Sequence, residues 1–181
     1  MVVARGADDA RTTALVARCR GVTPRLRIEE RGVIACDLAG LDGSPMRAGM
    51  RLVALCAPAS AGIAPSSFVA GVLARHTLPP AVRVVDDAAS FLAPLALSVL
   101  PLEDRLVAEL RLLGLRRVSD FTALPRGAVL DRFGRAAAAA HALAGGEEAP
   151  IDGGWDAPAR RIVARRAWDD EIVDRERLAF V

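Results

Sequence analysis

The sequence contains no lysine, asparagine, glutamine or tyrosine, so arginine supplies all 24 of its basic residues. Codons for the four missing residues all carry A at the second position, and a mutational bias toward G and C therefore explains their absence without any function. The formal net charge is only +2, which indicates no attraction of the whole chain to nucleic acid. Any contact with a polyanion must come from a local patch of arginines.

Long apolar runs, an export signal and paired cysteines are also missing. No stretch reaches the ~20 unbroken apolar residues that cross a bilayer, and charged residues from Arg5 to Arg11 stand where a secretory signal would be apolar. We therefore expect a soluble, cytoplasmic protein. Cys19, Cys36 and Cys56 have no CxxC spacing and lie far from both histidines, which disfavours a metal site and favours buried, reduced thiols.

The first half of the chain predicts helices packed on a mixed β-sheet, because helical and strand patterns alternate along it. The patterns predict a helix at 8–20, a hairpin at 26–38 with its turn near Arg31 and Gly32, a strand at 60–63, a helix at 66–76 opened by Pro65, and a strand at 81–87. Residues 46–57 fit a helix or a strand equally well.

The second half predicts a compact unit of short helices from about residue 99 to 150. Leucines at helical spacing and the stop residue Gly114 predict a helix at 103–113, and Ser119 is the expected N-cap of the next one. Pro125 and Gly134 bracket a further helix, in which we expect Phe133 to be buried. An alanine-rich helix then ends at two glycines. The tail is expected to be a linker followed by a strand at 161–168 and a short helix, with a partly ordered tail as the open alternative.

Residues 107–134, VAELRLLGLRRVSDFTALPRGAVLDRFG, resemble the thumb of the Y-family translesion DNA polymerases. In that family a helix, L-G-[IL], basic residues, a hydrophobic-Asp-hydrophobic step, LP and RFG follow one another in this order. The ImuB-like branch, whose members lack the family's chemistry, is the most similar branch.

Upstream segments extend the resemblance to about residues 7–150. TPRLRIEERGVIACDLAGL is similar to the palm hairpin, with Asp37 on its final D-x-x-G, and AGIAPSSFVAGVLAR is similar to the palm segment G-I-A-x-N-K-x-x-A-K-x-A-S. The resemblance implies an α+β fold. It assigns a partial palm with a mixed sheet and helices on one face to 1–98, a small all-α, helix-hairpin-helix-like thumb to 99–150, and a linker and the start of a little finger to 151–181.

Charged residues of the palm pattern are replaced in this sequence. The Asp-Glu pair that holds two Mg²⁺ ions falls on Gly32 and Val33, and two lysines that approach the triphosphate fall on Ser67 and Gly71. We expect the family's N-terminal metal-binding strand and its fingers to be absent as well. Asp37 could belong to a displaced metal site, although an aspartate at a turn is more often a hydrogen-bonding residue. The resemblance thus implies no catalytic, cofactor or metal residue.

Arginines of the thumb-like segment are the candidate DNA contacts. Helix-hairpin-helix elements direct backbone N–H groups at a phosphate, with arginines beside them. The candidates are Arg116, Arg117, Arg126, Arg132 and Arg135. A solvated helix face remains the alternative for each of them, and Glu103 and Asp104 would repel phosphate at the hairpin before the thumb helix.

The expected function is that of a non-catalytic, DNA-associated adaptor in DNA damage tolerance and mutagenic translesion synthesis, in the bacterial cytoplasm and associated with the nucleoid. The resemblance implies a sliding clamp, a RecA-like protein and an error-prone polymerase subunit as partners. Three alternatives stay open: an active Mg²⁺-dependent nucleotidyltransferase with a relocated site, a helix-hairpin-helix DNA-binding module without a polymerase role, and a truncated product with a residual fold.

Overall fold

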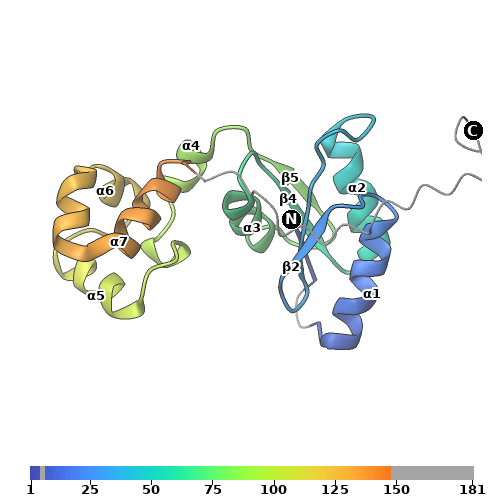
Figure 1. The fold of residues 1–181 in the computed structure, drawn as a ribbon, viewed down its shortest axis with the longest axis horizontal. Coiled ribbons are helices and arrows are strands. Elements are labelled where there is room, and N and C mark those ends of the chain that lie inside the picture. The colour runs from blue at the N-terminus through green and yellow to red at the C-terminus, as the bar shows by residue number, and fades with distance from the viewer. Residues whose placement is uncertain (5–6, 148–181) are drawn as a thin grey trace, which may run out of the picture.

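A computed structural model describes residues 1–4 and 7–147, so the linker and strand expected at 151–181 lie outside the described residues. Figure 1 shows two lobes side by side, which we call the sheet lobe (residues 1–87) and the helical lobe (residues 88–147). The fold is therefore α+β, as the sequence predicts. No helix in the described ranges combines the length and the apolar character that a membrane span requires.

The sheet has five strands in the order β2-β3-β1-β4-β5. Their bounds are β1 Val2–Val3, β2 Leu26–Glu30, β3 Val33–Cys36, β4 Ser60–Ile63 and β5 Val82–Val84. Only the β4–β5 pair is parallel, so the sheet is mixed, as predicted. The sequence did not predict the central strand β1, which pairs Val2 with both Ile34 and Ala61. Two residues are too few to produce an alternating pattern.

Helices cover both faces of the sheet, and the prediction of helices on one face is wrong. Helices α1 (Asp9–Arg20) and α2 (Pro45–Cys56) lie on one face, where Val2 and Ile34 join their core. Helix α3 (Ser67–Arg75) lies on the other face (Figure 1). Its Ala74 packs with Val3 and Val33. Adjacent residues of a strand point to opposite faces, so apolar pairs in the middle of the sheet require cover on both sides.

Side-chain caps set where the three helices begin. Asp8 accepts the Arg11 N–H at 2.7 Å before α1. Ser44 caps α2, so the segment that fits a helix or a strand equally well is helical as far as Cys56. Ser66 accepts the Val69 N–H at 3.1 Å before α3. Pro65 therefore lies outside that helix rather than at its first position.

The helical lobe contains α4 (Ala88–Leu92), the short 3₁₀ helix η1 (Leu97–Val99), α5 (Asp104–Leu112), α6 (Val118–Thr122) and α7 (Arg126–Ala144). Gly134 breaks α7 with φ 82° and ψ −176°, close to the helix end that the sequence predicts. The N-cap of α6 is Arg117, so the prediction of Ser119 is wrong. Phe121 is fully buried, whereas Phe133 is only partly buried. Val69 and Val72 of α3 belong to the same cluster of buried apolar residues as Phe121, and this cluster joins the two lobes.

Candidate functional site

A pocket of about 450 Å³ opens at one edge of the sheet. The carboxyl ends of β3, β4 and β5 and the N-terminus of α3 meet there because these three strands run in the same direction. Its polar side chains are those of Cys36, Asp37, Ser66, Ser67 and Asp86. Two carboxyl groups, the Met1 residue and no arginine line this described pocket, so it offers no cationic side chain to a triphosphate.

Gly32 occupies the tight turn between β2 and β3, with φ +72°. A Cβ atom built there would lie 2.3 Å from the carbonyl oxygen of Ala4 and 2.9 Å from Cβ of Ala7. The backbone of Gly32 is bonded on both sides: its N–H donates to Oγ1 of Thr12 at 3.0 Å, and its carbonyl oxygen accepts the Ala4 N–H at 2.7 Å. The position expected to carry a metal-binding aspartate is therefore filled by neighbouring backbone.

Val33, at the second expected acid position, belongs to the sheet core. It is 4% exposed and pairs with Val3 of β1. Its side chain packs with Val3 and Ala74 on the face that α3 covers. Burial of an ionised carboxylate there would leave it without a charged partner, which is costly.

Ser67 and Gly71, at the two expected lysine positions, lie on the first and second turns of α3. Ser67 lines the pocket, but Gly71 is buried, and a Cβ atom there would lie 3.3 Å from Nη1 of Arg75. The Arg75 guanidinium donates to Oε1 of Glu30 at 2.7 Å. The one cationic side chain of α3 is thus directed to an acid on β2.

Asp37 lies at the carboxyl end of β3 and makes two structural contacts. Its carboxylate forms an ion pair with Arg25 and accepts the Ala39 N–H at 2.9 Å. These contacts agree with the hydrogen-bonding role that an aspartate at a turn usually has. No three His, Cys, Asp or Glu side chains in the described part of the chain are grouped so that they could hold a metal ion.

Arg116 and Arg117 lie in the turn between α5 and α6, and both are exposed. Their backbone N–H groups donate to Oδ2 of Asp120, at 2.9 and 2.8 Å. These two bonds hold the pKa of the Asp120 carboxyl below its ordinary value. The N–H groups that could hold a phosphate are therefore engaged within the protein, and contact with DNA would depend on the two guanidinium groups.

The other three candidate arginines lie on α7 and are also exposed. Arg126 forms an exposed ion pair with Glu147 at 3.3 Å, which contributes little to stability. The Arg132 guanidinium lies 5.4 Å from the centre of the Phe133 ring, and Arg135 follows the break at Gly134. The structure thus places all five candidates in the helical lobe, two before α6 and three on α7.

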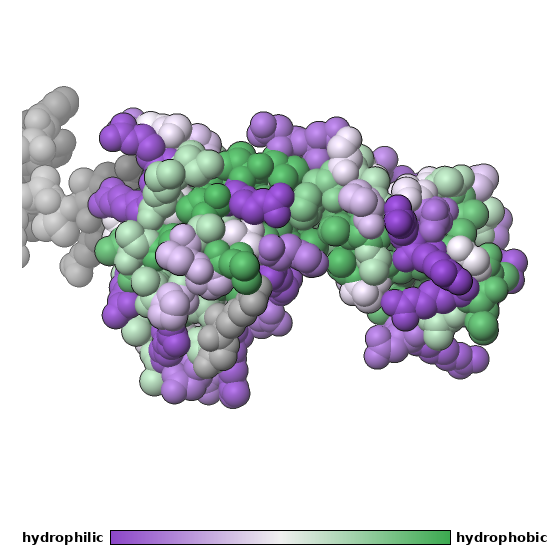
Figure 2. Space-filling view, turned by 180° about the vertical axis from the view of Figure 1, so that it is seen from behind, coloured by the Kyte–Doolittle hydropathy of each residue, from purple (hydrophilic) through white to green (hydrophobic). Residues whose placement is uncertain are grey.

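The helical lobe as a whole is not strongly basic, because its seven arginines face six acidic residues. Figure 2 shows hydrophilic side chains over much of this lobe, with apolar residues between them. Attraction to DNA would therefore depend on where the arginines lie and less on net charge.

Sequence reasoning did not predict three features of these sites. The close packing of Gly32 depends on Ala4 and Ala7, which lie in an unpredicted segment. The two bonds to Asp120 could have been suspected, because an acid three residues after a helix cap commonly accepts the cap N–H. No local pattern in the sequence indicates the contact between Cys19 and Cys56, because the two residues are 37 positions apart.

Sequence comparison finds relatives among curated proteins, although no family model matches the chain. The ImuB proteins of two Caulobacter vibrioides strains, NA1000 / CB15N and ATCC 19089 / CIP 103742 / CB 15, are each 33% identical to it over 138 residues. These matches cover 72% of this chain and 30% of each ImuB protein, so the chain spans less than a third of the length of these relatives.

Two solved structures from Sulfolobus solfataricus share the fold. A DinB-family error-prone DNA polymerase gives a TM-score of 0.56 over 68% of this chain and 40% of that one. A DinB structure gives a TM-score of 0.59 over 78% of this chain and 46% of that one. Sequence identity is 15% in both cases, so this likeness concerns the fold alone. The architecture matches part of a Y-family polymerase, as the sequence predicts.

Proposed function

Because the chain is an ImuB-like, partial relative of the Y-family DNA polymerases, we propose that it is a non-catalytic adaptor that binds DNA in damage tolerance. The observation that carries the proposal is the packing of Gly32 against Ala4, at the position of an expected metal-binding acid. A side chain cannot enter there unless the backbone moves. Two-metal nucleotidyl transfer would therefore lack one of its ligands at this position.

The pocket supports the same proposal. Its described lining has two carboxyl groups and, on α3, Ser67 at one of the two positions where phosphate-binding lysines are expected. Gly71, at the other position, is buried. A polyanionic nucleotide would meet no cationic side chain in this lining. The competing proposal, an active nucleotidyltransferase with a relocated site, needs Asp37 as a metal ligand. The ion pair of Asp37 with Arg25 disfavours it.

DNA binding is assigned to the five exposed arginines of the helical lobe, acting on backbone phosphates. The Asp120 contacts engage the N–H groups of Arg116 and Arg117, so salt-dependent contacts of guanidinium groups carry the binding. This makes the expected binding weak and largely independent of sequence.

The division of the chain is part of the proposal. We place a palm-like domain at 1–98, a thumb-like domain at 99–150 and the start of a little-finger-like segment at 151–181. The sliding clamp, a RecA-like protein and an error-prone polymerase subunit are the proposed protein partners, and the bacterial cytoplasm, in association with the nucleoid, is the proposed location. These assignments rest on the likeness to ImuB and not on any contact among the described residues.

Fluorescence anisotropy of labelled primer-template, duplex and single-stranded DNA at several salt concentrations tests the proposal. We compare Arg116→Ala/Arg117→Ala/Arg126→Ala with Arg47→Ala/Arg51→Ala/Arg83→Ala, which removes three exposed arginines from the sheet lobe. The first variant is expected to bind primer-template roughly tenfold more weakly, with a salt slope smaller by about 3. The control is expected to bind like the unaltered protein.

Equal losses in the two triple variants would mean that binding follows overall charge, and they would remove the role of the helical lobe. Absence of binding at low salt would contradict the DNA-associated function itself. Equal binding to duplex and primer-template would favour the helix-hairpin-helix module without a polymerase role.

A further inference from the structure

All three cysteines lie in the sheet lobe, close to one another. Cys19 is in the last turn of α1, Cys56 is the last residue of α2, and Cys36 is the last residue of β3. All three are free thiols. Cys19 and Cys56 are fully buried, whereas Cys36 is partly exposed and lines the pocket at the sheet edge.

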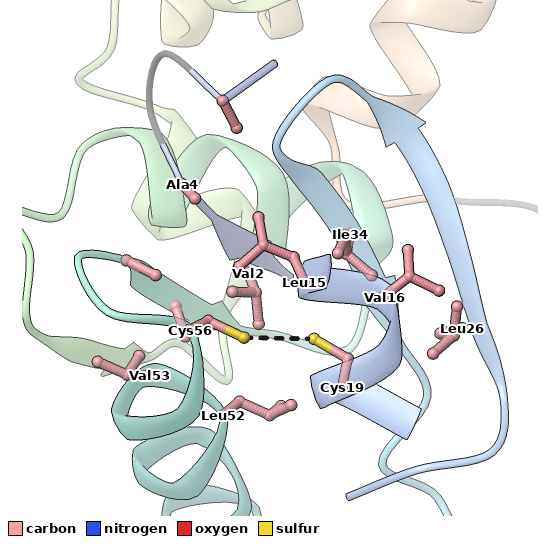
Figure 3. Close-up of a cluster of buried hydrophobic side chains, with 13 residues drawn as sticks. Val2, Ala4, Leu15, Val16, Cys19, Leu26, Ile34, Leu52, Val53 and Cys56 are labelled. Atoms are coloured by element: carbon pink, nitrogen blue, oxygen red, sulfur yellow. Dashed lines mark hydrogen bonds between the residues drawn. The ribbon is translucent and has the colours of Figure 1, made fainter. Parts of the chain in front are cut away.

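The sulfur atoms of Cys19 and Cys56 are in contact. Their Sγ atoms lie 3.6 Å apart, and Figure 3 shows the two side chains pointing toward each other between α1 and α2. A disulfide needs about 2.05 Å, so the atoms must approach by about 1.5 Å. Apolar side chains of Val2, Leu15 and Leu52 surround the pair and hold the two helices together.

The three cysteine thiols differ in pKa, and a thiol with a lowered pKa is more easily oxidised. Hydrogen bonds with Cys36 and Cys56, together with burial, raise the pKa of the Cys19 thiol. The hydrogen bond from Cys19 lowers the pKa of Cys36. The hydrogen bond from Cys19 lowers the pKa of Cys56 as well, but Cys56 is fully buried. Cys36 is therefore the one of these two residues that lines the pocket, and the thiolate is the reactive form of the group.

We propose that these cysteines form an oxidation site, in which a hydroperoxide reacts first at Cys36 and the stable product is a Cys19–Cys56 disulfide that joins α1 to α2. The proposal rests on the contact of the two sulfur atoms and on the position of Cys36 in the pocket wall. It does not depend on the proposed DNA function.

Each step balances. The Cys36 thiolate attacks one peroxide oxygen, the O–O bond breaks, and sulfenic acid and water form once the released hydroxide takes a proton. The Cys19 thiol then attacks the Cys36 sulfur, forming an S–S bond and releasing the second water. Cys56 finally attacks the Cys19 sulfur, and Cys36 leaves as a thiol that takes the Cys56 proton. Two thiols have lost two electrons and two protons, and one peroxide has become two waters.

The folded protein is treated with hydrogen peroxide and analysed by intact mass spectrometry and peptide mapping. The expected product is a monomer lighter by about 2 Da, with one alkylatable thiol of the original three and a peptide pair joined through Cys19 and Cys56. Dithiothreitol should restore all three thiols. Because mapping uses the unaltered chain, the result does not depend on a variant that folds.

Variants then test the order of events. Cys36→Ser, which leaves the buried pair in place, is expected to slow formation of the disulfide at least tenfold without changing the product. Cys56→Ala should stop the reaction at a Cys19–Cys36 disulfide. A Cys19–Cys36 bond as the final product of the unaltered chain, or three intact thiols after peroxide treatment of the folded protein, would overturn the proposal.

Discussion

The two lobes differ at the positions where the family resemblance predicts charged side chains. In the sheet lobe neutral residues occupy those positions, and at Gly32 the backbone of Ala4 leaves no room for a side chain. In the helical lobe the candidate arginines are present and exposed. Among the described residues one of the five forms an ion pair, Arg126 with Glu147, and that pair is itself exposed.

This difference follows from what each kind of site requires. A two-metal site needs several carboxylates held close together, so loss of one position removes the chemistry and frees the space for packing. Phosphate binding needs only accessible positive charge, and each arginine contributes separately. The proposed function, in which catalysis is lost in one lobe and DNA contacts are retained in the other, is therefore physically consistent.

The largest expected effect concerns the core of the helical lobe. Phe121→Ala should lower the free energy of unfolding by about 4 kcal/mol, because the ring is fully buried and contacts His141 edge to face. Phe133→Ala, at a partly buried ring, should cost roughly 1.5 kcal/mol. Urea unfolding of both variants measures the difference. Equal losses would mean that Phe133, as the sequence suggested, belongs to the core.

Gly32→Asp tests the sheet lobe by returning an acid to the expected catalytic position. We expect a loss of about 3 kcal/mol, because the new side chain meets the Ala4 backbone and the residue keeps a positive φ. Gly40→Asp is the matched control, with φ +76° and open space around its Cβ, and it should cost about 1 kcal/mol. If the two variants unfold at the same urea concentration, the space at Gly32 is not closed.

Asp37→Ala separates a structural role from a metal-binding role. Loss of the Arg25 ion pair and of the Ala39 N–H bond should lower stability by about 1 kcal/mol. Addition of Mg²⁺ should not change the thermal midpoint of the unaltered protein. A midpoint that rises with Mg²⁺ in the unaltered protein and not in the variant would instead assign a metal to this carboxylate.

Asp120→Asn gives the smallest expected effect and tests the turn that presents Arg116 and Arg117. The folded-state pKa of Asp120 is lowered by two N–H donors, so its contribution to stability is present above its ordinary pKa and is lost as the pH falls through the lowered value. The variant should therefore be less stable near neutral pH and equal to the unaltered protein in strong acid. A stability difference that does not change with pH would contradict this account.

Local signals were enough to predict most elements of the fold. Asp8 and the apolar residues of 8–20 identified α1, and the alternation around Arg27 and Ile28 identified β2. Strand β1 was missed because it has only two residues. Residues 46–57 were left open between helix and strand, and the structure shows a helix that Ser44 caps and that ends at Cys56. The side of the sheet that each helix covers depends on tertiary packing, which no single segment encodes.

The sequence indicates which residues belong to the candidate sites, but less of the geometry around them. Motif order pointed to Gly32 and to the five arginines, whose contact with DNA stays a prediction. It could not predict that Ala4 fills the space at Gly32 or that Asp120 engages the N–H groups of Arg116 and Arg117. Both contacts form only when the chain has folded, because they bring segments or turns together.

Primer extension tests the central claim most directly. A labelled primer-template is incubated with the protein at a concentration that saturates anisotropy, together with Mg²⁺ and all four deoxynucleoside triphosphates. The account predicts a bound primer that is not extended by a single nucleotide. Extension that disappears in Asp37→Ala would contradict it and would establish an active nucleotidyltransferase with a relocated metal site.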